Sequence, residues 1–290
     1  MPLPEPPAAG SPMLPPGTFA GQVVAVTGGG TGLGKAMAIE FARLGAGVAI
    51  LSRKPEQRQR GIEAVEAAGG RACGAEVDIR QPEQIARAFD EVERVLGPID
   101  VLVNNAAGNF PVVSEDLSPN GWRAVTQIVL DGTWFCSHEL AKRCIAAGRP
   151  GAILNIGATY AFNGGPGAVH SAAAKAGVHN LTMTLAVEWA QHGIRVNELM
   201  PGMFPHEDMA AHMKANRPEG YSEAGKQVPA GRVGRLHELG WAATYLCSPY
   251  AAYVTGHTFV IDGANWLRRG LQMPEYKPVR EQIRARPTTR

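Results

Sequence analysis

The sequence contains few cysteines and lacks a long apolar run. Four cysteines occur in 290 residues, and no two are close enough to form a metal-binding or disulfide pair: Cys73, Cys136, Cys144 and Cys247. We therefore expect no metal site, and free thiols are typical of a reducing compartment. No run of about 18 apolar residues is present, so the sequence predicts no membrane-spanning helix.

The sequence also has no strong excess of positive or negative charge. The 28 Lys and Arg residues nearly balance 26 Asp and Glu residues, for a net charge of +2, which excludes nucleic acids and membrane surfaces as expected partners. The first basic residue is Lys35, so the proline-rich residues 1–20 resemble neither a secretory signal nor a transit peptide. We expect these residues to form a flexible tail and the protein to be cytoplasmic.

Beyond Gln22, short apolar runs alternate with longer amphipathic segments, which is typical of βαβ units. This pattern predicts one doubly wound, Rossmann-like α/β domain over residues 21–265, with a parallel sheet between two helical layers. Strands are expected at Val23–Thr27, Val48–Ser52, Ala72–Val77, Val101–Val103, Ala152–Ile156, Arg195–Leu199 and Thr258–Ile261. Helices are expected at Gly34–Leu44, Glu56–Ala68, Pro82–Leu96 and Pro119–Ala147.

One segment interrupts this alternation of strands and helices, and another follows it. Residues 203–228 mix prolines, glycines and charges, and we expect a mobile insert on the substrate side of the domain. Within it, the run His206-Glu207-Asp208 has the composition of a metal site, but we interpret it as solvated. Residues 266–290 form a basic extension with seven Lys or Arg against two Glu.

A glycine-rich turn follows the first strand and opens the first helix. Glycines tighten such a turn and let the backbone approach a pyrophosphate, which helix N-terminal amides then bind. The alternative is a tight loop without a ligand. The candidate cofactor-binding residues are Gly28, Gly30, Thr31, Gly32 and Leu33.

The end of the second strand indicates which dinucleotide binds. Arg53 and Lys54 stand where an NAD site usually carries a carboxylate, and a cation favours the 2′-phosphate of NADP(H). A solvated surface pair is the alternative. Asp78, after the third strand, is placed either to accept a hydrogen bond from the adenine amino group or to cap the next turn.

Three further motifs make a family resemblance specific. They are Asn104-Asn105-Ala106-Ala107-Gly108, Ser171 with Lys175, and Pro201-Gly202. In this order, and with the glycine-rich turn, they resemble the short-chain dehydrogenase/reductase family over about residues 20–265. The resemblance implies that Asn105, Lys175, Pro201 and Gly202 contact the cofactor, and that the protein is a homo-oligomer, usually a tetramer.

The catalytic residues depart from the usual pattern of that family. Ser171 occupies the position of the helical tyrosine, Ala158 that of the upstream serine, and Asp131 that of a helix asparagine. Tyr160 stands 15 residues before Lys175, just after the fifth strand. With Asn109 in Gly-Asn-Phe, this arrangement resembles the 2,4-dienoyl-CoA reductases, especially the mitochondrial type. The resemblance implies NADPH-dependent reduction of a 2,4-dienoyl-CoA, with the 3-enoyl isomer as product.

The chemistry of that reaction gives each residue a role. Negative charge collects on the thioester oxygen, far from the carbon that receives hydride, so donors must be placed at that oxygen. Our hypothesis is that Tyr160 and Asn109 supply these donors, while Lys175 binds the nicotinamide ribose and Ser171 hydrogen-bonds nearby or positions a water. The alternatives are a loop tyrosine packed on the core and an ordinary turn asparagine.

The same resemblance suggests further substrate contacts. Phe110, Ser118 and Arg80 match positions that touch the acyl-CoA, although Ser118 also has the sequence of a helix cap and Arg80 that of a surface charge. Arg53 is a further candidate, His170 is a candidate acid or base, and the basic extension is a candidate for the CoA phosphates, a neighbouring subunit or solvent. Two rival functions remain: a family member acting on another carbonyl or alcohol, and an NADP-binding sensor without turnover.

Overall fold

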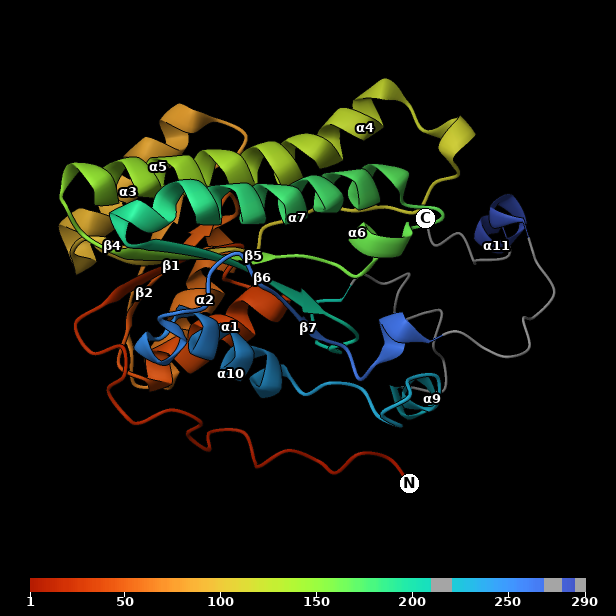
Figure 1. Ribbon diagram of the computed structural model, residues 1–290, viewed down its shortest axis with the longest axis horizontal. Helices are drawn as coiled ribbons and strands as arrows, with labels where there is room; N and C mark the ends of the chain where they lie inside the picture. Colours follow the sequence, from red (N-terminus) through yellow and green to blue (C-terminus); the bar gives the residue numbers. More distant parts are fainter. Residues whose placement is uncertain (210–220, 269–277, 285–290) are drawn as a thin grey trace.

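The computed structural model describes residues 1–209, 221–268 and 278–284. Its centre is a seven-stranded, fully parallel sheet with strand order β3-β2-β1-β4-β5-β6-β7 (Figure 1). The strands are β1 (Val23–Thr27), β2 (Gly47–Ser52), β3 (Arg71–Glu76), β4 (Ile99–Asn104), β5 (Gly151–Ile156), β6 (Ile194–Pro201) and β7 (Thr258–Ile261). All seven expected strands are confirmed, with ends that shift by at most two residues.

Helices cover both faces of this sheet, as the doubly wound prediction requires. One layer holds α1 (Gly32–Arg43), α2 (Pro55–Ala67) and α10 (Leu236–Cys247), and the other holds α3 (Pro82–Leu96), α5 (Gly132–Ala146) and α7 (Val169–Trp189) (Figure 1). Shorter elements complete the described chain: α4 (Pro119–Thr126), α6 (Tyr160–Asn163), α9 (Tyr221–Lys226), α11 (Val279–Arg284) and five short segments, η1 (Ser114–Asp116), η2 (Gln127–Asp131), η3 (Ala190–His192), η4 (Pro249–Ala251) and η5 (Asn265–Leu267).

The core is divided by the sheet into two apolar clusters. Along β1, Val24 and Val26 pack into the cluster under α1 and α10, whereas Val23 and Ala25 face the cluster under α3 and α5. This alternation follows from the pleat of a strand, whose successive side chains point to opposite faces. Because both faces are covered, every residue of β1 is buried, which explains its continuous apolar sequence.

The long helix expected at Pro119–Ala147 is interrupted. It consists of α4, the π-helical segment η2 (Gln127–Asp131) and α5. The prediction of a capped start is confirmed, since the Gly121 amide donates to the Ser118 hydroxyl at 3.0 Å and Pro119 is the first helical residue. Asp131 ends the π-helical segment, a type of irregularity that is frequent near functional sites.

The N-terminal segment differs from the expected flexible tail. Phe19 is completely buried and packs edge-on against Phe41 of α1, with ring centroids 5.1 Å apart. Nearer the start, the Leu3 amide donates to the Ala230 carbonyl at 2.7 Å. Leu14 and Phe19, two apolar residues of this proline-rich segment, belong to the core cluster. Their burial removes apolar surface from water and so holds the segment against the domain.

The remaining expectations concern segments that are only partly described. Residues 210–220 of the expected insert, and residues 269–277 and 285–290 of the basic extension, lie outside the described residues. None of the helices in the described ranges combines the length and apolar character that crossing a bilayer requires.

Candidate active site

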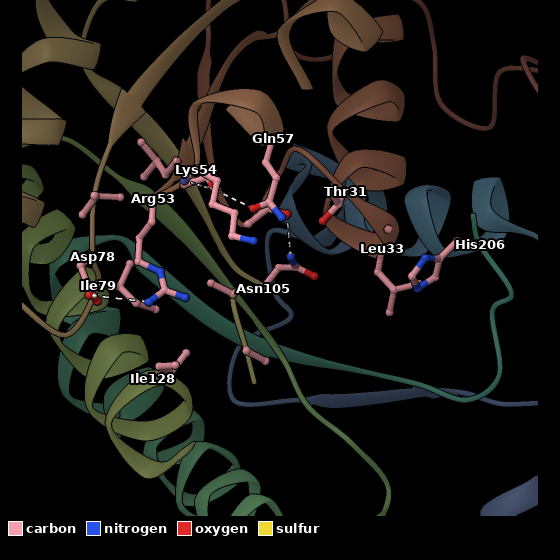
Figure 2. A pocket seen from close by; sticks show the side chains of 17 residues that line it. Thr31, Leu33, Arg53, Lys54, Gln57, Asp78, Ile79, Asn105, Ile128 and His206 are labelled. Carbon is pink, nitrogen blue, oxygen red and sulfur yellow. Dashed lines mark hydrogen bonds and ion pairs between the residues drawn. The ribbon is translucent and has the colours of Figure 1, made fainter. Parts of the chain in front are cut away.

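A cleft of about 430 Å³ opens at the carboxyl ends of β1, β2 and β3, next to β4 (Figure 2). The strand order reverses between β1 and β4, and such a switch point is where parallel α/β sheets bind ligands. Eight predicted cofactor residues line this cleft: Gly28, Thr31, Gly32, Leu33, Arg53, Lys54, Asp78 and Asn105. The cleft is therefore the place where the structure brings the predicted dinucleotide site together.

The glycine-rich turn follows β1 and begins α1. Gly32 has a φ of +51°, which favours glycine, and its amide stands at the N-terminus of the helix. Gly30 does not line the cleft. A Cβ at that position would come 1.9 Å from the Gln57 carbonyl oxygen, so Gly30 permits close packing of α2. The Gly32 amide thus stands at the N-terminus of α1, on the border of the cleft that Gly32 lines.

A carboxylate already lies at this helix N-terminus. The Gly32 amide donates to Asp208 Oδ2 at 2.8 Å, and Arg60 binds the other carboxylate oxygen at 3.1 Å. Glu207 beside it pairs with Lys35 at 2.5 Å. Our interpretation of His206-Glu207-Asp208 as solvated was wrong for Asp208, because its side chain is only 15% exposed. The contact shows that this end of α1 accommodates an anion.

Two cations stand at the mouth of the cleft, at the end of β2. Arg53 is about half exposed, and its Nη1 lies 3.9 Å from Asp78 Oδ2 (Figure 2). Arg80 binds the same carboxylate, with Nε 2.9 Å from Oδ1. The pKa of Asp78 is held below its usual value, first by the hydrogen bond from Arg80. Asp78 is thus ionised and engaged by Arg80, which is the candidate that sequence reasoning assigned to the substrate.

Asn105 lines the cleft but is used by the protein itself. Its side-chain amide donates to the Thr27 carbonyl at 3.0 Å, and its backbone amide donates to the Thr27 hydroxyl at 2.9 Å. These bonds join the ends of β1 and β4, which flank the switch point. Asn105 therefore stabilises the part of the cleft that lies between these two strand ends.

A row of polar side chains lies along the N-terminal part of α7. The Tyr160 hydroxyl of α6 lies 2.9 Å from Ser171 Oγ, and Lys175 follows Ser171 by about one helical turn. The Lys175 ammonium is buried and donates to the Ile156 carbonyl at the end of β5. The structure thus brings the tyrosine, serine and lysine candidates together, although Tyr160 begins a short helix instead of lying in a loop.

Burial shifts the pKa values of Tyr160 and Lys175 in opposite directions. Burial raises the pKa of Tyr160, an effect that the hydrogen bond with Ser171 opposes. Burial lowers the pKa of Lys175 to about 8, and the nearby carboxyl of Glu198 opposes that change. At neutral pH, Tyr160 is therefore a hydrogen-bond donor and Lys175 is largely charged.

Asn109 and Phe110 lie in the segment after β4, and both are exposed. The Asn109 side chain makes no hydrogen bond within the described part of the chain, and none joins it to Tyr160. Phe110 packs edge-on against His170, with ring centroids 4.6 Å apart. His170 is fully buried, and its Nδ1 accepts a hydrogen bond from the Ser171 amide at 2.8 Å. Its side chain therefore stabilises the first turn of α7, to which both residues belong.

Sequence reasoning missed several residues that line the cleft. Gln57 accepts a hydrogen bond from Ser52 at 3.1 Å, and Ile128 and His206 close the opposite sides (Figure 2). The proximity of Gln57 to the end of β2 was a usable signal, whereas nothing local identified Ile128. Pro201 ends β6 and Gly202 follows it; neither lines this cleft, and the Gly202 amide donates to the Ile261 carbonyl of β7 at 2.9 Å. Among the described residues, no group of three or more His, Cys, Asp or Glu is arranged to hold a metal ion.

Comparison with known proteins agrees with this geometry. A family model described as Enoyl-(Acyl carrier protein) reductase matches residues 28–264, which span the turn, the cleft and the polar row. The chain belongs to the short-chain dehydrogenase/reductase family. As a member, it is an oxidoreductase that uses a nicotinamide cofactor.

Solved structures of this family share the fold over most of both chains. A short-chain dehydrogenase from Bacillus anthracis superimposes with a TM-score of 0.80 at 42% identity, covering 86% of this chain and 98% of the other. A gluconate 5-dehydrogenase from Burkholderia cenocepacia, in complex with NADP and tartrate, gives a TM-score of 0.79 at 31% identity, covering 87% and 97%.

Two curated relatives carry a more specific name. A Bacillus subtilis protein named "Probable 2,4-dienoyl-CoA reductase [(2E)-enoyl-CoA-producing]" is 41% identical over 85% of this chain and 97% of its own length. A Caenorhabditis elegans protein named "Probable 2,4-dienoyl-CoA reductase 3 [(3E)-enoyl-CoA-producing]" is 38% identical over 89% and 84%. This chain is therefore similar to proteins named for the reduction of dienoyl-CoA.

Proposed function

We propose that this chain reduces 2,4-dienoyl-CoA thioesters with NADPH. The observation that carries the proposal is the 2.9 Å contact between the Tyr160 hydroxyl and Ser171 Oγ. A tyrosine from α6 thereby delivers its hydroxyl beside the helix position at which the family usually carries one. A displaced donor suits a substrate whose oxygen lies several bonds from the carbon that accepts hydride.

The cation pair supports NADPH over NADH. Arg53 and Lys54 lie at the mouth of the cleft, where a 2′-phosphate would meet them, and the Gly32 amide would face the pyrophosphate. Lys175 would bind the nicotinamide ribose. When bound, NADPH supplies the hydride.

Hydride addition at the δ-carbon of the dienoyl group moves an electron pair through the conjugated bonds to the thioester oxygen. The Tyr160 hydroxyl and the Asn109 amide would donate hydrogen bonds to that oxyanion, and Lys175 would add a positive charge nearby. Tyr160 remains protonated because burial raises its pKa, so it acts as a donor throughout. Addition of a proton from water to the α-carbon then gives the 3-enoyl product, whereas its addition to the γ-carbon would give the 2-enoyl product.

The acyl-CoA would approach from the side of Phe110. This ring is 38% exposed and packs against His170, so it offers a fixed apolar surface. Ser118 caps α4 beside it, and we retain Ser118 and Arg80 as proposed contacts of the acyl-CoA. Arg80 would have to share its guanidinium between Asp78 and the ligand.

The test is NADPH oxidation in the presence of a 2,4-dienoyl-CoA, with Tyr160→Phe compared with the parent. We expect turnover by the parent and a loss of about 10²- to 10³-fold in the variant. Tyr253→Phe is the matched control, since Tyr253 is fully exposed and should leave the rate unchanged. A parent that binds NADPH but reduces only simple ketones would refute the substrate assignment. Unchanged turnover in Tyr160→Phe would refute the role of Tyr160.

A further inference from the structure

Glu198 is a fully buried carboxyl in β6, on the side of the sheet that faces α7. His179 Nδ1 of α7 lies 2.8 Å from Glu198 Oε2, and the Thr258 hydroxyl of β7 donates to the same oxygen at 3.0 Å. Glu198 Oε1 is also buried, and no protein atom among the described residues hydrogen-bonds to it. One carboxylate oxygen is thus held by two elements while the other is left without a hydrogen bond.

Glu198 and Lys175 approach the same peptide group. The Lys175 ammonium donates to the carbonyl of Ile156, the last residue of β5. The next residue is Gly157, where a Cβ would come 2.2 Å from Glu198 Oε1. The free oxygen of Glu198 therefore points to the Ile156–Gly157 peptide, and the absence of a side chain at Gly157 makes room for it.

We propose that Glu198, held in place by His179 and Thr258, is a positioning residue that supplies the negative charge balancing the buried ammonium of Lys175. This inference rests on the proposed function only in that Lys175 serves as the cation beside the nicotinamide ribose. An unpaired buried charge is strongly destabilising, so a lysine in this place needs a compensating group. Ile156 offers only a carbonyl dipole, whereas Glu198 offers a full charge.

The charges around Lys175 agree with this assignment. Burial lowers the pKa of Lys175 to about 8, and the Glu198 carboxylate is the charged group that acts in the opposite direction. Burial raises the pKa of Glu198, while the hydrogen bonds from His179 and Thr258 and the charge of Lys175 favour its ionised form.

The other elements packed on α7 supply different groups to this region. The titratable side chain from α6 is Tyr160, which contacts Ser171, and β5 provides the Ile156 carbonyl. Segment η2 places Leu130 against Gly177 of α7 and ends at Asp131. The charge that acts on the pKa of Lys175 is that of Glu198. The carboxyl of Glu198 is therefore the group to remove when the balance of charge at Lys175 is tested.

The experiment compares Glu198→Gln with the parent by titrating NADPH fluorescence between pH 6 and pH 10, without substrate. Gln keeps the shape and loses the charge, so the pKa of Lys175 should fall. We expect the ratio of the two dissociation constants to be near one at pH 6 and to rise to about tenfold above pH 8, which corresponds to a shift of about one pH unit. The alkaline limb of turnover should move to lower pH by the same amount.

Two substitutions of the neighbouring histidine separate charge from packing. His179→Asn keeps a donor near the position of Nδ1 and should resemble the parent, whereas His179→Ala removes it and should reproduce part of the Glu198→Gln effect. Thermal unfolding of each variant identifies loss of folding. A dissociation-constant ratio that is constant across pH, in a folded Glu198→Gln protein, would show a purely structural role and overturn the inference. A parent that binds NADPH but does not reduce dienoyl-CoA would refute only the proposed function, because the binding titration needs no substrate.

Discussion

Tyr160 and Ser171 lie 11 positions apart in sequence, on separate helices, and their side-chain oxygens are 2.9 Å apart. The contact joins the start of α6 to the first turn of α7, and burial of Ser171 (2% exposed) leaves the serine little freedom to move. The orientation of the Tyr160 hydroxyl therefore depends on Ser171. This dependence can be tested by substituting each residue alone and both together.

Ser171→Ala should lower turnover by about tenfold, less than Tyr160→Phe, because the tyrosine keeps its hydroxyl but loses the group that orients it. In the double variant, the effects should not add, since both substitutions break the same contact. The measurement is a double-mutant cycle on kcat/KM with a 2,4-dienoyl-CoA. Strict additivity would contradict a shared role.

Arg53→Ala should weaken NADPH binding by about 10- to 100-fold and leave NADH binding nearly unchanged, because a charge-assisted bond to the 2′-phosphate contributes about 1.5–3 kcal/mol. Fluorescence titration of both cofactors measures this. Arg71→Ala is the control, since Arg71 is exposed at the start of β3 and far along the strand from the cleft. Equal weakening of NADPH and NADH would argue against the assignment of NADPH.

Asp208→Asn should tighten NADPH binding by about two- to fivefold. The carboxylate stands at the Gly32 amide, where the pyrophosphate is expected, so its charge competes with the ligand for the helix N-terminus. Glu207→Gln removes an equal charge from the adjacent residue, whose ion pair is with Lys35, and should have less effect. Calorimetric titration of NADPH into each variant makes the comparison. Weaker binding by Asp208→Asn would show that the carboxylate assists the cofactor.

Lys175→Met should abolish turnover and change how the free energy of unfolding depends on pH. The pKa of Lys175 is about 8 in the folded chain, against about 10.5 for an ordinary lysine. Below pH 8 both states carry the proton, so folding must bury the charge. Between pH 8 and pH 10.5 only the unfolded chain holds the proton, so the penalty fades as pH rises.

The free energy of unfolding of Lys175→Met minus that of the parent should accordingly be greatest below pH 8 and decrease toward pH 10. Urea unfolding of both proteins at pH 7 and at pH 10 tests this. A difference that is equal at both pH values would mean that packing, and not charge, is responsible.

Phe19→Ala should destabilise the protein by about 3–5 kcal/mol, because the side chain is fully buried against Phe41 and its loss leaves a cavity. Met13→Ala, in the same segment but 45% exposed, should change the free energy of unfolding by less than about 0.5 kcal/mol. Urea unfolding of both variants is the measurement. Equal, small effects would indicate that residues 1–20 behave as the flexible tail that the sequence suggested.

The fold could be predicted because its signals are local. A buried parallel strand such as β1 must be apolar along its whole length, and Ser118-Pro119 marks a helix start by its own chemistry. The candidate site was less accessible to such reasoning. Asp208 reaches Gly32 across 176 positions, and the partners of Glu198 come from two other elements. A sequence shows that Glu198 lies in a strand, but not that His179 and Thr258 meet it there.

The contacts of the N-terminal segment bear on how this enzyme can be handled. Glu5 pairs with Arg235 at 2.8 Å, and His237 lies within hydrogen-bonding distance of the Pro7 carbonyl, so the segment is attached to the start of α10. Helix α10 packs along α1, whose first residue is Gly32, one of the residues that line the cleft. We therefore expect a pulling force applied through an N-terminal anchor to reach the glycine-rich turn by this path. Immobilisation through an exposed surface lysine such as Lys142 avoids that path.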